Sequence, residues 1–324
     1  MRILILGGTS LTGPYAVRRL HAMGHEVTVF HRGEHQAELP AGIRHLLGDF
    51  AHLPREASDP APDVVVHMWA MTEMDAESLV KRFRGVASRA VVISSGDVYR
   101  AYGRLTGLES GPPDPIPLTE DAPLRESRYP YRRMAPNPDH WMTQYDKVLV
   151  EQVLMHQSDL PTSVLRFPAV LGPKECRRFQ RWLQSMLRGD MELRMQDGWA
   201  KWRRTHGFAE DISEAVVLAA TNSSSAGRIY NVGESYTPTM RDRLAEFARI
   251  VGWRGRIFEV PASELDEMDR MPHDFTHHIA YDTTLIRTEL GYEEVVSPEV
   301  SLERTVEYER AFDGKIDNPR SRSS

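Results

Sequence analysis

The chain has 324 residues, of which 41% are hydrophobic and 27% are charged, and its formal net charge is −6. This length is sufficient for a sizeable core, and the acidic balance argues against a general nucleic-acid-binding surface. The single cysteine, Cys176, excludes intrachain disulfides and cysteine-rich metal sites, so we expect no metal. No long apolar run or signal peptide is present, and we therefore expect a cytoplasmic protein without a membrane span.

The first 33 residues predict a strand, a glycine-rich turn, a helix and a second strand. Residues 2–6 are apolar, residues 15–23 carry apolar side chains at helical spacing, and residues 26–30 resemble a strand again. The start of such a helix offers free N–H groups and a positive dipole end to a pyrophosphate. The usual middle glycine is replaced by a serine, whose hydroxyl can still bind a phosphate. The predicted cofactor-binding residues here are Gly7, Thr9, Ser10, Leu11, Thr12 and Gly13.

The end of the second strand bears on which dinucleotide binds. An acidic residue there would bind the ribose 2′-OH of NAD, whereas a nearby arginine accommodates the 2′-phosphate of NADP. The chain has His31 and Arg32 at this position, so we favour NADP and keep NAD as the alternative. Asp49, followed by Phe50, is a candidate for the edge of the adenine.

Strands and helices alternate as far as residue 170, which predicts an α/β fold with a doubly wound parallel Rossmann sheet. Residues 63–68 and 90–94 are apolar, strand-like runs, and residues 76–87 between them are helical in pattern. Residues 111–140 are rich in proline and carry an aromatic, basic run that includes Tyr131, a candidate substrate-binding residue. This stretch is either a lid over the ligand crevice or an ordinary surface loop.

After residue 170 the pattern becomes irregular and charged, which predicts a smaller C-terminal substrate-binding domain. We place the dinucleotide-binding domain at residues 1–165, with residues 205–235 returning to it. Residues 166–204 and 236–312 then form the substrate-binding domain, and residues 313–324 form a flexible tail.

The segment from Val91 to Tyr99, together with Lys147 and Glu151, resembles the extended short-chain dehydrogenase/reductase family of NAD-dependent epimerases and dehydratases. Further matches follow in the family's order at residues 63–70, 164–173, 204–212, 227–233 and 290–292. The resemblance implies a homodimer formed through helices at residues 76–87 and 141–156. It also places Phe167 at the cofactor, and Trp69 either at the nicotinamide pocket or in the core.

The resemblance further implies that Ser95 binds the reacting oxygen and that Lys147 holds the nicotinamide ribose and lowers the pKa of a catalytic tyrosine. That tyrosine belongs four residues before the lysine, where this chain has Thr143. Thr143 is a poor proton carrier, although it could position a water or a substrate hydroxyl. Tyr145 lies two residues before Lys147, which on a helix is a turn of about 200°, so its ring is expected to point away unless the first turn is distorted.

Asp97 is a second candidate for the acid/base, because the family's sugar dehydratases and decarboxylases carry an acidic residue here. The alternative is that Asp97 only caps a turn. Arg178 and Arg204 either bind a phosphate or carboxylate of the substrate or are ordinary exposed arginines. The three histidines His273, His277 and His278 lack a further metal ligand, so we interpret them as solvated or substrate-lining.

These observations lead to an enzyme that uses NADP or NAD and acts on a hydroxyl or carbonyl of a small polar substrate, perhaps a nucleotide sugar, by transient or net hydride transfer. The alternative is a catalytically degenerate protein of the same fold that senses the cofactor or binds RNA. The absence of the usual tyrosine motivates this alternative, and the acidic charge speaks against RNA.

Overall fold

The computed structural model describes residues 1–35, 37–175 and 178–311. The predicted tail, residues 313–324, lies outside the described residues. Strands and helices alternate along most of the described chain. The sequence predicts this alternation only as far as residue 170, and the irregular pattern expected after that residue is wrong. None of the helices in this described part combines the length and the apolar character that crossing a membrane requires.

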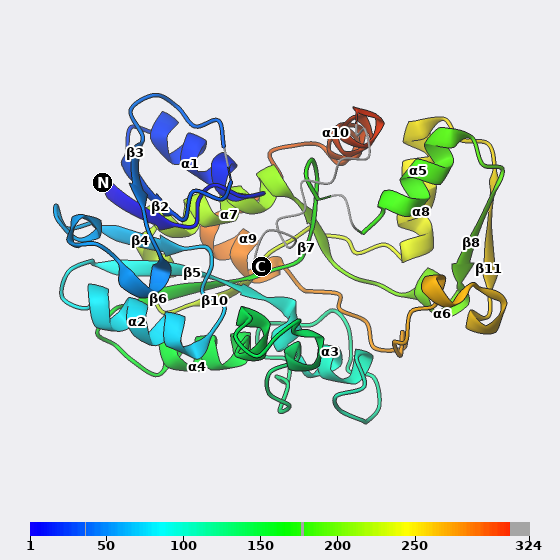
Figure 1. The fold of residues 1–324 in the computed structure, drawn as a ribbon, viewed down its shortest axis with the longest axis horizontal. Coiled ribbons are helices and arrows are strands. Elements are labelled where there is room, and N and C mark those ends of the chain that lie inside the picture. Colours follow the sequence, from blue (N-terminus) through cyan, green and yellow to red (C-terminus); the bar gives the residue numbers. More distant parts are fainter. Residues whose placement is uncertain (36, 176–177, 312–324) are drawn as a thin grey trace.

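Within the described residues, seven parallel strands form the central sheet in the order β10-β6-β5-β4-β1-β2-β3 (Figure 1). The strand order reverses direction at β1, which confirms the predicted doubly wound α/β sheet and places a ligand crevice at its carboxyl edge. The strands are β1 (Arg2–Leu6), β2 (Glu26–His31), β3 (Arg44–Leu47), β4 (Val64–His67), β5 (Arg89–Ser95), β6 (Thr162–Phe167) and β10 (Ile229–Asn231).

Helices cover both faces of this sheet, and in Figure 1 α1 and α7 lie above it while α2 and α4 lie below. Ile3 and Ile5 of β1 pack in the core with α1 and α7, whereas Leu4 and Leu6 pack in the core with α2 and α4. Burial on both faces explains why β1 is apolar without interruption. The helices are α1 (Gly13–Ala22), α2 (Glu73–Phe83), α4 (Lys147–Met155), α7 (Ala209–Thr221) and α9 (Thr284–Leu290).

A second group of elements packs around its own core to the right of the sheet in Figure 1. Trp182 and Trp199 stack at its centre, with ring centroids 4.4 Å apart. The elements of this group and those that connect it to the sheet are α3 (Arg100–Leu105), β7 (Ala169–Leu171), α5 (Gln180–Arg188), β8 (Glu192–Gln196), α6 (Asp197–Lys201), β9 (His206–Phe208), α8 (Met240–Val251), β11 (Arg256–Val260) and α10 (Pro298–Ala311). The predicted domain boundaries, the homodimer and the cytoplasmic location stay predictions.

Two helices differ from the sequence-based expectation. The helix predicted at residues 76–87 is α2, which starts earlier because Thr72 and Asp75 form a capping box. The helix predicted at residues 141–156 is also wrong at its start: residues 141–143 form a single 3₁₀ turn, and α4 begins only at Lys147. Asp146 caps α4, because its side chain accepts a hydrogen bond from the N–H of Val148 at 3.0 Å.

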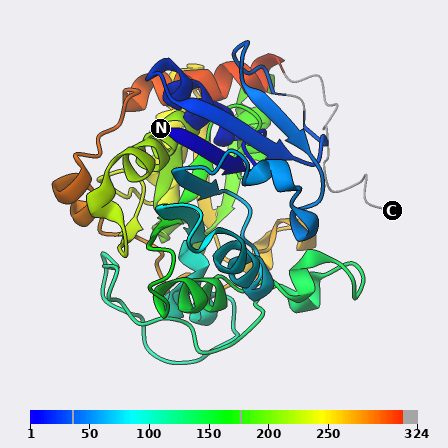
Figure 2. The same ribbon diagram turned by 90° about the vertical axis from the view of Figure 1, so that its left-hand side faces the viewer.

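The loop between α3 and α4 contains the proline-rich stretch. In Figures 1 and 2 it runs along the lower side of the molecule, opposite to α10. It begins and ends beside the carboxyl edge of β5, because α3 follows directly on the turn after that strand. The loop is therefore positioned to bring side chains over the crevice.

Candidate active site

Asp97 lies in a tight turn directly after β5 and is 5% exposed. Ser95 caps this turn, since its Oγ accepts a hydrogen bond from the N–H of Asp97 at 3.4 Å. In the described residues the carboxylate of Asp97 accepts from two tyrosine hydroxyls and from no backbone N–H, so the alternative that it only caps a turn is wrong. Glycine is required at the residue between them, because a Cβ on Gly96 would lie 1.3 Å from the Oη of Tyr281.

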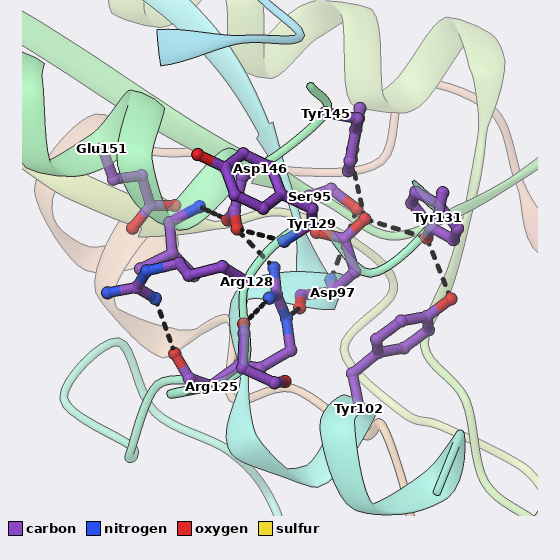
Figure 3. Close-up of polar contacts among 12 residues, drawn as sticks. Ser95, Asp97, Tyr102, Arg125, Arg128, Tyr129, Tyr131, Tyr145, Asp146 and Glu151 are labelled. Carbon is purple, nitrogen blue, oxygen red and sulfur yellow. Dashed lines mark hydrogen bonds and ion pairs between the residues drawn. The ribbon is translucent and has the colours of Figure 1, made fainter. Parts of the chain in front are cut away.

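Three tyrosines converge on the Asp97 carboxylate (Figure 3). The hydroxyls of Tyr145 and Tyr131 both donate to its Oδ2, at 2.7 and 3.0 Å. The hydroxyl of Tyr102 donates in turn to that of Tyr131 at 2.9 Å. Among the described residues, Oδ1 of Asp97 is buried without a hydrogen-bond partner, so one lone acceptor remains in an otherwise satisfied group. We call Asp97 and these three tyrosines the Asp97 cluster.

The expectation that Tyr145 points away from Lys147 is wrong. That expectation assumed a helix through both residues, whereas Tyr145 precedes α4 and Asp146 has an extended backbone with φ −159°. Tyr145 is buried, and its ring centroid lies 5.9 Å from the Nζ of Lys147. Thr143 is held elsewhere, since its hydroxyl donates to the carbonyl of His140 at 2.8 Å. An aspartate directly before Lys147 is the sequence signal that would have placed the helix start correctly.

Lys147 lies in the first turn of α4, and its ammonium is buried near the carboxyl ends of β4 and β5. Its Nζ donates to the carbonyls of Ala70 and Ile93, at 2.6 and 2.9 Å. Burial lowers the pKa of Lys147 to about 8, while the negative charges of Asp97 and Asp75 act in the opposite direction. The ammonium therefore loses its proton much closer to neutral pH than an exposed lysine does.

Burial also shifts the two groups that Lys147 faces. It raises the pKa of Asp97, and the hydrogen bond from Tyr145 opposes this rise. Burial and the charge of Asp97 raise the pKa of Tyr145 well above its ordinary value. Tyr145 consequently keeps its proton and donates a hydrogen bond to the carboxylate, while burial moves the pKa of Asp97 upward from its ordinary value.

A buried ion pair holds the Asp97 cluster together, and sequence reasoning missed it. Arg125 donates from Nη2 to Oδ1 of Asp146 at 3.0 Å, and both side chains are fully buried. Arg125 also donates from Nε to the carbonyl of Asp97 at 3.0 Å, while Oδ2 of Asp146 accepts from the N–H of Tyr129 at 2.8 Å. The pair thus ties the turn after β5, the long loop and the start of α4 into one unit (Figure 3).

The glycine turn after β1 has the shape that a dinucleotide phosphate needs. Gly7 has φ +93° and Leu11 has φ +37°, so the backbone turns sharply at both. A Cβ on Gly13 would lie 2.5 Å from the carbonyl carbon of Gly8, so only glycine lets α1 start this close to the turn. The N–H of Gly7 donates to the carbonyl of Phe30 at 2.9 Å and fixes the turn to the end of β2.

The polar residues of this turn are also placed at the start of α1. Thr9 and Thr12 are buried, whereas Ser10, which stands where the usual glycine would be, is exposed. The carbonyl of Thr12 accepts from the hydroxyl of Ser213 on α7 at 2.7 Å, which anchors the helix start. The turn therefore fits a pyrophosphate at the N-terminus of α1, and the chain's own backbone supplies the close approach.

Arg32, Trp69 and Phe50 come together beside the glycine turn. The Arg32 guanidinium lies 5.7 Å from the ring centroid of Trp69 and 6.0 Å from that of Phe50, and it pairs with Glu34 at 2.9 Å. A Cβ on Gly7 would be 3.4 Å from the Cβ of Trp69, so the Trp69 side chain is in contact with the glycine turn. Trp69 is only half-buried, which disagrees with a packed core position.

Two further predicted cofactor residues lie at the same edge. Asp49 directly precedes Phe50, in the segment that follows β3. Phe167 ends β6 and is paired in register with Ser95, the last residue of β5. The structure therefore gathers these predicted positions at the carboxyl ends of neighbouring strands, where parallel sheets bind ligands.

Arg178 and Arg204 lie near each other and near the tyrosines of the Asp97 cluster. Burial and the charge of Arg204 lower the pKa of Arg178 to about 10, while the negative charge of Glu175 acts in the opposite direction. Nε of Arg178 is buried with no hydrogen-bond partner among the described residues; the nearest carboxylate, that of Glu175, is 3.7 Å away. The Arg178 side chain is partly exposed, and a guanidinium with an unused donor that is still within reach of solvent is suited to an anionic ligand.

The three C-terminal histidines contact different partners. Nε2 of His277 is 3.4 Å from a carboxylate oxygen of Asp274, and Nδ1 of His278 accepts from the N–H of Arg203 at 3.1 Å. The ring of His273 packs edge-on against Phe275, with centroids 5.9 Å apart. In the described part of the chain, no three His, Cys, Asp or Glu side chains gather where they could hold a metal ion.

Comparisons with known proteins place this geometry in context. The family model described as "NAD dependent epimerase/dehydratase family" matches residues 3–233. A 3-diazoavenalumate denitrifying reductase from a Streptomyces species is 30% identical over 186 residues, which are 53% of this chain and 57% of that protein. The 2′-dehydrokanamycin reductase of Streptomyces kanamyceticus is 25% identical over 276 residues, which cover 81% of this chain and 70% of that one.

Among solved structures, an NAD-dependent NDP-hexosamine 5,6-dehydratase involved in tunicamycin biosynthesis has the same fold, with a TM-score of 0.71 and 22% identity. The match covers 97% of this chain and 99% of that one. The chain thus spans little more than half the length of the first reductase but nearly the whole of the dehydratase fold.

Proposed function

This chain belongs to the NAD dependent epimerase/dehydratase family, and on that premise we propose that it is a nicotinamide-dependent enzyme acting on a hydroxyl or carbonyl carbon of a small polar substrate. The observation that carries the proposal is the dry carboxylate of Asp97, which Tyr145 and Tyr131 hold at the end of β5. Ser95 and Lys147 flank it. Buried acid/base groups beside a cofactor turn are typical of active sites.

The residues that would hold the cofactor are supplied by the first strand, turn and helix. The turn from Gly7 to Gly13 and the start of α1 would bind the pyrophosphate, and Lys147 would bind the nicotinamide ribose. When bound, the nicotinamide supplies a hydride acceptor or donor. The protein then has to bind the substrate, orient its oxygen and move one proton.

Asp97 moves that proton in the proposed mechanism. Its Oδ1 is the carboxylate atom without a partner, so it accepts the proton of a substrate hydroxyl during oxidation and returns a proton to the carbonyl oxygen during reduction. Burial raises the pKa of Asp97, which brings the carboxyl closer to the range where a general acid or base is effective. Ser95 orients the same oxygen, and the hydroxyl of Tyr145 holds the carboxylate in place.

Net reduction of a carbonyl is the reaction that we propose to test first. Both curated relatives are named as reductases. Epimerisation and dehydration would use the same groups on this chain, because each also begins or ends with proton transfer at an oxygen or at the neighbouring carbon.

NADP is the proposed cofactor, with NAD as the alternative. The end of β2 carries no carboxylate that would repel a 2′-phosphate, and Arg32 follows directly. The partner of Arg32 is Glu34, at 2.9 Å, and both side chains are about half exposed, so the pair is weak enough for a 2′-phosphate to compete with it.

The substrate is proposed to carry a carboxylate or phosphate. Arg178 and Arg204 lie close enough for the charge of one to lower the pKa of the other, and Arg178 keeps an unused buried donor. An anionic group of the substrate would neutralise this repulsion and complete the hydrogen bonding. The hydroxyls of Tyr131 and Tyr102 are near both the two arginines and Asp97, so they would lie near the bound anion as well.

The rival hypothesis of a degenerate sensor or RNA-binding protein rested on the missing tyrosine at position 143. Tyr145 supplies a phenol beside Lys147 and Asp97, so that motive is gone. We therefore propose the catalytic function alone.

The test follows oxidation of NADPH with a panel of carbonyl compounds that carry a carboxylate or phosphate, including UDP-sugars. With a substrate found, D97N should lose about 10²- to 10⁴-fold in kcat, the usual contribution of a general acid/base. D121N, which changes an exposed aspartate of the same loop, is the matched control and should keep the wild-type rate. Nucleotide binding by D97N should match that of the wild type. Full turnover by D97N would overturn the assigned role of Asp97.

A further inference from the structure

Two histidines on the neighbouring strands β2 and β3 contact each other through their side chains. His31 is the last residue of β2, and His45 lies on β3, which runs parallel beside it. Nε2 of His31 is 3.0 Å from Nδ1 of His45, and the two rings meet edge to face with centroids 5.2 Å apart. The N–H of Gly33 also approaches Nδ1 of His31, at 3.2 Å.

These contacts determine where the protons lie in the free protein. The N–H of Gly33 donates to Nδ1 of His31, so that nitrogen is an acceptor and Nε2 carries the proton. Nε2 of His31 then donates to Nδ1 of His45, which leaves the proton of His45 on its own Nε2. Both rings are neutral in this arrangement, and the exposed His45 ring keeps a free N–H.

A second proton would break the arrangement. Protonation at Nδ1 of His45 would set two N–H groups against each other, and protonation at Nδ1 of His31 would face the N–H of Gly33. In agreement, burial lowers the pKa of His31, and the charge of His45 lowers it further. A positive charge on His31 is therefore disfavoured in the free protein unless an anion arrives to stabilise it.

The pair lies where an adenosine ribose is recognised in dinucleotide folds. That ribose sits at the carboxyl end of the second strand. The carbonyl of Phe30 accepts a hydrogen bond from the N–H of Gly7. His31 is the next residue after Phe30, so it lies beside the glycine turn. Arg32 follows His31 and supplies a fixed positive charge.

We propose that His31 and His45 form a proton-linked subsite for the 2′-phosphate of NADP. The phosphate replaces the hydrogen bond between the two rings, and each ring donates the N–H that it already carries at Nε2 to a phosphate oxygen. The broken hydrogen bond leaves Nδ1 of His45 without its donor, and this nitrogen takes up one proton from solvent next to the phosphate dianion. This inference rests on the proposed preference for NADP, and it adds His45, a residue on a different strand, to the recognition of that phosphate.

The surrounding charges are compatible with this subsite. Arg32 and Glu34, in the turn after His31, neutralise each other in the free protein. Arg44 precedes His45 on β3, and Arg18 of α1 donates to the carbonyl of Glu38 in the loop after β2. The side chains of Arg32, Arg44 and Arg18 are cationic. Two carboxylates follow the pair in the sequence: Glu34, three residues after His31, pairs with Arg32, and Asp49 lies four residues after His45.

The proposal gives a distinct pH dependence. A bound phosphate dianion favours the protonated form of the pair by charge attraction, so NADPH binds most tightly at the acidic end of the range and more weakly as the pH rises. A phosphate monoester loses its second proton at about pH 6, which would act in the opposite direction at lower pH. Measurements from about pH 6.5 to 8.5 avoid that overlap. NADH lacks the phosphate, and its affinity should not change in this way.

The experiment titrates the full-length protein with NADPH and with NADH and follows nucleotide fluorescence across this pH range. For the wild type, the ratio of NADPH to NADH affinity should fall by up to about tenfold for each pH unit. H45Q should bind NADPH about tenfold more weakly at the acidic end, with a flat ratio, and should bind NADH within about twofold of the wild type. H156Q is the matched control, because His156 is an exposed histidine at the end of α4 and belongs to neither β2 nor β3.

Calorimetry in two buffers of different ionisation enthalpy gives a second readout. NADPH should take up about one proton more than NADH in the wild type, and H45Q should lose this difference. The inference is overturned if the wild-type ratio does not change with pH, or if H45Q weakens both nucleotides equally. A wild type that binds NADH alone would refute both the subsite and the NADP preference while leaving the role of Asp97 intact. A wild type that binds neither nucleotide would refute the proposed function itself.

Discussion

The glycine turn and the Asp97 cluster lie at the same edge of one sheet, but they are built in different ways. The turn uses seven consecutive residues, and its shape follows from backbone sterics at Gly7 and Gly13. The Asp97 cluster takes its side chains from the turn after β5, from α3, from the long loop and from the approach to α4. One region is local in the sequence, whereas the other exists only after the chain has folded.

The difference shows in what each region needs for its stability. The turn is held by a neighbouring backbone and by the close start of α1. The cluster buries a carboxylate and needs the ion pair between Arg125 and Asp146 to fix the segments that carry it. We therefore expect the stability of the Asp97 cluster to depend on contacts between segments far apart in the sequence. The stability of the glycine turn should depend on glycines, whose lack of a side chain lets α1 start close to the turn.

The largest effect is expected from breaking the ion pair. R125L would leave Asp146 buried without its cation and should lower the free energy of unfolding by about 3 to 5 kcal/mol. The matched control is R84L, because Arg84 and Asp159 form an exposed pair at 3.8 Å that is worth at most about 1 kcal/mol. Urea unfolding followed by circular dichroism measures both. Equal stability of the two variants would mean that the cluster does not need the pair.

A smaller effect is expected from adding one methyl group to the turn. In G13A the new Cβ meets the backbone of Gly8, so α1 has to move; we expect a loss of about 1 to 3 kcal/mol together with much weaker nucleotide binding. G85A is the comparison, because Gly85 has φ +68° with open space around it and should cost about 1 kcal/mol without affecting the nucleotide. Unchanged binding by G13A would contradict the role assigned to the turn.

The smallest effect is expected from the positive charge of Lys147, which lies near the Asp97 cluster and is proposed to bind the nicotinamide ribose. Burial lowers the pKa of Lys147 to about 8, so kcat/KM should fall as the pH rises through that value and the ammonium is lost. K147R keeps its charge to much higher pH, so its profile should lack this alkaline fall even if its maximal rate is lower. The measurement is the pH dependence of kcat/KM. An alkaline fall at the same pH in K147R would assign it to another group.

The two regions also differ in how well the sequence predicts them. The strands near residues 2–6, 26–30, 63–68 and 90–94 and the glycine turn are predicted correctly, because apolar runs and glycine spacing are local signals. The strands β3, β8 and β11 are not predicted. Tyr145 is misplaced in the prediction, since its orientation depends on where α4 begins and Asp146 decides that start. Arg125 and Tyr102 carry no local signal for the site, because long loops bring them to Asp97 only in the folded chain.

The sequence by itself determined the doubly wound sheet, the glycine turn and the presence of Ser95, Asp97 and Lys147 at the ends of their elements. Steric limits on the backbone and the alternation of apolar side chains act over a few residues, and both can be read from the order of residues alone. The tertiary structure decided which hydroxyl meets the Asp97 carboxylate, that its charge lies in a dry environment, and that His45 lies beside His31. Burial, desolvation and contacts between distant segments arise only when the strands and loops pack together.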